Sequence, residues 1–133
     1  MQSSTCAART LLRGFDKAGI AIIVDKHNEL REKVASGAET HGYLPAACDM
    51  RKITWSNELA VVAQRWADQC RFGNDDDRSK CDGTFVGQNT FSSWQSVNST
   101  REEIMKNSAT AVQSWYNEVI TTGFSNLHIS PFV

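Results

Sequence analysis

The sequence has no apolar run long enough to cross a membrane. Its longest apolar-leaning stretch, "AGIAIIV", gives way at once to "DKHNELREK", whereas a membrane-spanning helix needs about 18 apolar residues or more. The chain also lacks an excess of either charge, because 14 basic and 15 acidic residues leave a formal net charge of -1. Nothing electrostatic therefore predicts a nucleic-acid partner or an anionic membrane surface. With 133 residues, the sequence predicts a single globular domain.

A secretory leader is also lacking, because the first ten residues, "MQSSTCAART", contain no apolar core. The four cysteines, however, include no C-x-x-C pair, which disfavours zinc and thioredoxin-like chemistry. Two disulfides or buried free thiols remain as alternatives. The tripeptide "NST" makes Asn98 a candidate N-glycosylation site. Together these features favour a secreted, extracellular protein whose leader is absent from this chain.

Apolar residues at helical spacing predict three amphipathic helices, at 16–36, 57–70 and 100–121. Asp16 is a candidate N-cap for the first helix, and Gly37 is a suitable left-handed stop after it.

The other two helices also have candidate caps. Ser56 precedes the second helix, and "STRE" places Ser99 as N-cap of the third with Glu102 in the capping-box position. Between the helices, "KITW" (52–55) and "GTFVGQN" (83–89) are candidate strands.

No catalytic or metal centre follows from the residue patterns. A calcium loop starting at Asp75 fails, because Lys80 stands where glycine is required and Val86 where the final glutamate is required. We therefore interpret the three consecutive aspartates as a solvated turn. His27 lies on the apolar stripe of the first helix, where a hydrogen-bonded core histidine is the more common case. No G-x-S-x-G nucleophile elbow exists, and the histidines His27, His41 and His128 are far apart in the sequence.

Four motifs resemble the CAP superfamily, which comprises cysteine-rich secretory proteins, antigen 5 and plant pathogenesis-related class 1 proteins. "IVDKHNELREKVASG" is similar to the opening helix of the family, with its H-N-x-x-R core at His27, Asn28 and Arg31. "ITWSNELAVVAQRWADQC" resembles the second helix, and "VGQN" and "WYNEV" follow in family order. The arthropod antigen 5 branch, which includes the venom allergen 5-like proteins, is the most similar. The resemblance covers residues 17–133.

The resemblance implies an α+β fold, a three-layer α/β/α sandwich with a small antiparallel sheet. It divides the chain into an N-terminal extension (1–15) and a partial CAP domain (16–133), C-terminally incomplete and truncated before the later strands. Members of this branch are secreted, disulfide-bonded and usually not enzymes, and they bind lipids, sterols, other small amphiphiles or proteins. The resemblance therefore implies a non-enzymatic, monomeric binding protein without a cofactor. The alternatives are a CAP-type hydrolase (a protease or esterase) or a non-functional truncation product.

Many members of the family hold a divalent cation with two histidines and two acidic residues. The matching positions here are Asn74, Gln88 and Glu118, so that only Glu118 keeps a ligand. His128 lies before the place of the second histidine and does not match it. Because neutral amides bind zinc poorly, we expect no metal at this tetrad.

The resemblance also bears on the cysteines. It implies a disulfide between Cys6 and Cys70, which leaves Cys48 and Cys81 as the second pair.

Overall fold

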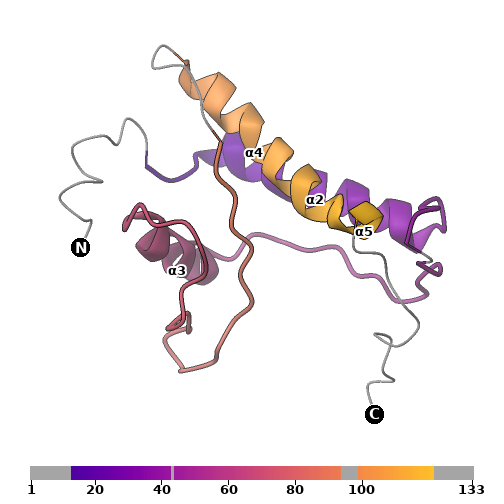
Figure 1. Cartoon of the computed structure of the whole chain (residues 1–133), viewed down its shortest axis with the longest axis horizontal. Coiled ribbons are helices and arrows are strands. Elements are labelled where there is room, and N and C mark those ends of the chain that lie inside the picture. The colour runs from indigo at the N-terminus through magenta and orange to yellow at the C-terminus, as the bar shows by residue number, and fades with distance from the viewer. Residues whose placement is uncertain (1–12, 43, 94–98, 122–133) are drawn as a thin grey trace.

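The computed structural model describes residues 13–42, 44–93 and 99–121, and these residues form four helices (Figure 1). The helices are α2 (Lys17–Ala35), α3 (Asn57–Ala67), α4 (Arg101–Tyr116) and the short α5 (Glu118–Thr121). No helix in this part of the chain is both long and apolar enough to cross a membrane.

Helices α2 and α4 lie side by side and run in the same direction (Figure 1). At their N-terminal ends, Arg101 Nε is 3.0 Å from Asp16 Oδ2. The close approach depends on Gly19, since a Cβ built there would lie 2.6 Å from Met105 Sδ. Most of the buried apolar side chains of the described residues belong to this pair, namely Leu30, Met105, Ala111 and Val112. Packing between α2 and α4 therefore supplies the main core.

The predicted starts of the first two helices are confirmed. The Asp16 Oδ1 atom accepts a hydrogen bond from Gly19 N at 2.9 Å, and Ser56 Oγ accepts one from Leu59 N at 3.3 Å. Gly37 has the expected left-handed backbone, with φ of 75°.

The predicted cap of the third helix is wrong by one residue. Thr100, not Ser99, is the N-cap of α4, and its Oγ1 accepts from Glu103 N at 3.2 Å. The Glu103 carboxylate accepts in return from Thr100 N at 2.7 Å, which completes a capping box. Glu102 instead forms a surface ion pair with Lys106, one turn further along the helix.

Two helix ends also differ from the prediction. Helix α3 ends at Ala67 and not at Cys70, whose backbone is left-handed with φ of 52° and cannot continue a helix. The third predicted helix is divided at Asn117 into α4 and α5.

Neither candidate strand forms a ladder within the described residues, so the expected sandwich is not confirmed there. The segment 51–55 instead runs along α2, because Asn28 acts as a neighbouring strand would. Its Nδ2 donates to Ile53 O at 3.0 Å, and its Oδ1 accepts from Ile53 N at 2.9 Å. Arg31 donates twice to Arg51 O. The H-N-x-x-R motif thus satisfies backbone groups that a sheet would otherwise pair.

The second candidate strand, 83–89, contributes only an isolated antiparallel bridge between Ser79 and Phe85. It follows α3, which packs against no other described helix. Helix α3 is held by side-chain contacts to neighbouring segments: Arg13 pairs with Asp68, and Trp66 Nε1 donates to Gly73 O at 2.8 Å.

Candidate functional site: the α2–α4 groove

An apolar groove of about 250 Å³ lies between the C-terminal halves of α2 and α4. Helix α2 contributes four residues at spacings of three and four, which places them on one face of the helix. Two residues from connecting segments complete the wall. We call this cavity the α2–α4 groove, and its lining residues are His27, Leu30, Arg31, Val34, Met50, Asn89, Val112, Trp115 and Tyr116.

One end of the groove is formed by two rings held in fixed orientations. His27 Nδ1 is 2.8 Å from Ile23 O and must donate, because a carbonyl oxygen only accepts. The predicted hydrogen bond of His27 is therefore confirmed, but the side chain is half-buried and does not belong to the buried core. Trp115 Nε1 donates to Thr90 O at 3.0 Å, and its ring lies 6.3 Å from the imidazole.

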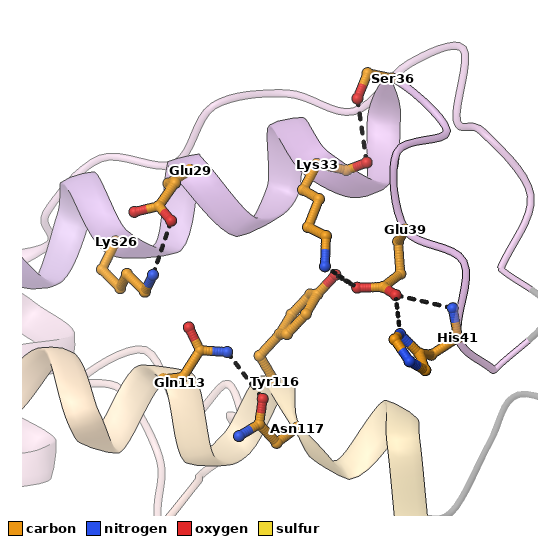
Figure 2. A network of polar contacts seen from close by, with 9 residues as sticks. All are labelled: Lys26, Glu29, Lys33, Ser36, Glu39, His41, Gln113, Tyr116 and Asn117. Atoms are coloured by element: carbon orange, nitrogen blue, oxygen red, sulfur yellow. Dashed lines mark hydrogen bonds and ion pairs between the residues drawn. The ribbon is translucent and has the colours of Figure 1, made fainter.

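The other end is formed by Tyr116, which reaches a buried carboxylate beyond the end of α2 (Figure 2). The hydroxyl of Tyr116 donates to Glu39 Oε2 at 2.5 Å, and Lys33 Nζ donates to the same oxygen at 2.7 Å. The second oxygen, Oε1, accepts from the backbone N and from Nδ1 of His41, each at 2.8 Å. Only 2% of the Glu39 side chain is exposed. The carboxylate is therefore desolvated but fully satisfied.

These contacts change the proton affinities of both groups. The Lys33 ammonium, the Tyr116 hydroxyl and the two His41 donors hold the pKa of Glu39 well below its ordinary value of 4.5. Burial of the phenol, together with the adjacent Glu39 carboxylate, raises the pKa of Tyr116 to about 12. At neutral pH the pair is therefore an ionised acceptor and a neutral donor, which favours a strong charge-assisted hydrogen bond.

A second cavity, of about 290 Å³, lies between α3 and the segment that follows it. We call it the α3 pocket. Arg78 crosses this region, where its Nε donates to Val86 O at 2.9 Å and its guanidinium stacks on the Phe85 ring at 4.4 Å. The lining residues are Leu59, Val62, Ala63, Arg78, Val86, Gly87, Gln88 and Asn89.

The structure does not bring the three tetrad positions together in one cavity. Gln88 lies in the wall of the α3 pocket, where its Oε1 accepts from Asp75 N at 2.7 Å. Asn74 is exposed and lines neither cavity. Glu118 is an exposed residue at the start of α5. Among the described residues, no three histidines, cysteines or carboxylates cluster as metal ligands.

The cysteines differ from the expected second pair. Cys48 and Cys81 are both exposed free thiols, so the expected disulfide between them is absent. Cys48 follows the end of α2, whereas Cys81 lies beside the first turn of α3, with its N donating to Glu58 Oε1 at 3.3 Å. Cys70 is disulfide-bonded, to neither of these two thiols. The expected partner of Cys70, Cys6, lies outside the described residues. The same is true of the candidate glycosylation site Asn98 and of His128.

Sequence reasoning missed Glu39, because it lies between the predicted helix 16–36 and the candidate strand 52–55, outside every predicted element and motif. Its partners come from six positions earlier, two positions later and 77 positions later in the chain. Such a site has no local sequence signal, since no motif spans these separations. Lys33 and Tyr116 each lay within a motif quoted above, "IVDKHNELREKVASG" and "WYNEV", but Glu39, which joins them, did not.

A family match covers most of the chain. Residues 24–131 match the model of the CAP family, described as the cysteine-rich secretory protein family. The chain belongs to the CAP family. This confirms the resemblance carried by the H-N-x-x-R core and by "WYNEV". Each motif contributes two residues to the α2–α4 groove, His27 and Arg31 from the first and Trp115 and Tyr116 from the second.

Among relatives of this CAP protein, the venom allergens are prominent. Venom allergen 3 of Solenopsis invicta is 44% identical over 125 residues, covering 90% of this chain and 49% of the relative. The venom allergen 3 homolog of Dinoponera quadriceps is 40% identical over 125 residues, covering 88% and 49%. Venom allergen 5 of Polybia paulista is 50% identical over 94 residues, covering 65% and 44%. The chain thus spans about half the length of these curated relatives. No solved structure matches it.

Proposed function

We propose that this CAP protein is a secreted, non-enzymatic binding protein whose ligand is a small amphiphile held in the α2–α4 groove. The supporting observation is the groove itself, in which Leu30, Val34 and Val112 offer an apolar surface between ring side chains at either end. Ligand pockets commonly combine such a surface with a few polar groups that orient the ligand. Here His27, Arg31 and Asn89 supply those groups.

The side chains of the groove support binding over turnover. The lining residues include no serine, threonine, cysteine, lysine or carboxylate, so the usual side-chain nucleophiles are lacking there. The hydroxyl of Tyr116 donates to Glu39, and His27 Nδ1 donates to a backbone carbonyl. The amides of Asn74 and Gln88, which stand at two positions of the family's metal-binding tetrad, also support binding over turnover, because a neutral amide is not a general acid or base.

Secretion is supported by the chemistry of the cysteines and by the names of the relatives. Cys70 is disulfide-bonded, and stable disulfides are typical of oxidising compartments outside the cytosol. The relatives quoted above are named as venom allergens.

A binding titration tests the ligand assignment. The full chain is titrated with dansyl-undecanoic acid, a fluorescent amphiphile, and the dansyl emission is followed. We expect saturable binding that Val34→Trp weakens at least about tenfold, because the indole fills the groove. The control is Val61→Trp on α3, where the valine is 61% exposed, and it should leave the affinity unchanged.

Two results would contradict the proposal. Binding that does not saturate would show that the amphiphile is not a specific ligand. An equal loss of affinity in Val34→Trp and Val61→Trp would show that the ligand does not bind in the α2–α4 groove. Hydrolysis of a p-nitrophenyl ester by the wild-type chain, abolished by Val34→Trp and not by Val61→Trp, would instead favour the hydrolase alternative.

A further inference from the structure

Tyr116 belongs both to the α2–α4 groove and to the polar cluster around Glu39 (Figure 2). Its ring lines the cavity, while its hydroxyl donates to a carboxylate that is almost fully buried. Lys33 Nζ lies 5.6 Å from the centre of the same ring, within the range of a cation–π contact. The ring is therefore fixed at its tip and along one face.

Glu39 is itself held so that it cannot follow a displaced ring. Lys33 and Tyr116 both donate to Oε2, and the backbone N and Nδ1 of His41 both donate to Oε1. Moving Tyr116 would remove a donor from an ionised, buried oxygen, and such a loss costs more than breaking a solvated hydrogen bond. The wall that Tyr116 forms is consequently stiff compared with one made of free aliphatic side chains.

The cluster lies at the C-terminal end of α2. Helices α2 and α4 are parallel, and the apolar face of α2 runs from His27 through Leu30 to Val34. Lys33 is in the last turn of α2, and Glu39 follows just beyond its end. An alkyl chain that lies along this face therefore meets the Tyr116 ring at the C-terminal end of α2.

We propose that Tyr116 is the specificity-determining end wall of the α2–α4 groove and sets the longest alkyl chain that the groove accepts. Glu39 is the positioning residue that holds this wall. The proposal rests on the proposed function, because it concerns the amphiphile bound in the same groove. It adds a selectivity for chain length and assigns that selectivity to a residue pair separated by 77 positions.

The test is competition by n-alkyl carboxylates against the bound dansyl-undecanoic acid. Octanoate, dodecanoate and hexadecanoate are compared, and the result is the ratio of the hexadecanoate affinity to the octanoate affinity. Carboxylates are suitable because Arg31 lines the groove and carries a positive charge. We expect Tyr116→Ala to raise this ratio about tenfold, because the added methylenes gain an apolar path.

Two milder variants keep the test decisive if Tyr116→Ala unfolds. Tyr116→Phe retains the ring and loses the hydroxyl, while Glu39→Gln retains the shape and loses the charge. Both should raise the ratio about threefold, because the ring is present but no longer tied. Glu102→Gln is the matched control, since Glu102 is exposed and pairs only with Lys106 at the surface, and its ratio should equal that of the wild type.

The outcomes separate this inference from the proposed function. If wild-type protein binds neither the dansyl probe nor any carboxylate, the proposed function fails. A different result is that the wild type binds these ligands but Tyr116→Ala and Tyr116→Phe lower the affinities for all three carboxylates by the same factor. Tyr116 would then not select for chain length, although the proposed binding function would stand. A ratio that changes in Tyr116→Phe and not in Glu39→Gln would remove only the positioning role of Glu39.

Discussion

The α2–α4 pair and the α3 region are both built from amphipathic helices, α3 being the most amphipathic of the three, but they are stabilised in different ways. The pair buries Leu30, Met105 and Val112 between two parallel helices. Helix α3 buries one apolar side chain, Val62, while Val61 and the following Phe72 are 61% and 74% exposed. Ion pairs, hydrogen bonds and a disulfide hold α3 in place of helix packing.

The difference indicates that the two regions have different local stabilities. Burial of apolar surface is the largest favourable contribution to folding, so segments that bury little open more readily. The α2–α4 groove lies in the packed pair. The α3 region exposes apolar side chains beside the α3 pocket and depends on a few specific tethers.

The largest expected effect comes from shortening one leucine in each region. Leu30→Ala should lower the free energy of unfolding by about 3 kcal/mol, because Leu30 is 6% exposed and its removal leaves a cavity. Leu59→Ala, at a residue that is 43% exposed, should change it by less than about 0.5 kcal/mol. Urea unfolding followed by circular dichroism measures both. Equal losses would mean that α3 contributes to the same core.

The disulfide at Cys70 should matter next, and mainly to α3. Cys70→Ser should lower the free energy of unfolding by about 2 kcal/mol, through the lost crosslink. Hydrogen exchange read by mass spectrometry should show faster exchange of the α3 amides with little change in α2. Cys81→Ser, which removes a free exposed thiol, is the control and should be neutral. Uniform acceleration across α2 and α3 would show that the two regions open together.

The buried carboxylate should make the packed pair sensitive to acid. Because the pKa of Glu39 is lowered in the folded state, its stabilising contribution is present above the ordinary value of 4.5 and is lost as the pH falls further below it. Glu39→Gln should therefore melt below the wild type at pH 7, and the gap should close toward pH 2. Glu29→Gln, which alters an exposed ion pair with Lys26, serves as the control. A gap that is constant with pH would exclude ionisation of Glu39 as its cause.

The smallest expected change in stability concerns the N-cap of α4, for which Ser99 and Thr100 are the two candidates. Thr100→Ala should lower the free energy of unfolding by about 1 kcal/mol, because Thr100 Oγ1 is the acceptor for Glu103 N. Ser99→Ala should be neutral to within about 0.5 kcal/mol. Thermal melts of the two variants decide between the positions, and a larger loss at Ser99 would restore the cap that the sequence predicted.

Much of the helical part of the fold was predictable, and the reason is local. The caps Asp16 and Ser56 act on amides three residues away, so the pattern contains the interaction itself. The cap of α4 was missed because serine and threonine stand side by side, each with a glutamate three residues later. Family membership was also predictable, because its motifs lie within continuous segments.

The candidate strands failed for a different reason. A strand needs a partner, and the backbone of Ile53 finds one in the side chain of Asn28, 25 residues earlier. The alternation of apolar and polar residues in the sequence cannot show whether a segment pairs with another strand or with a side chain such as that of Asn28. The same holds for Cys48 and Cys81, whose pairing depends on whether the fold brings their backbones together.

Sequence periodicity and capping residues were sufficient to specify where α2, α3 and α4 form, because these depend on neighbours within a turn or two of the chain. The tertiary structure decided which faces meet, leaving α3 apart from the other helices and setting Trp115 and Tyr116 against α2. It also brought Glu39 to Tyr116 across 77 positions. The physical reason is that burial and ion pairing depend on distances in space, and for residues far apart in the sequence these distances are fixed only when the helices pack.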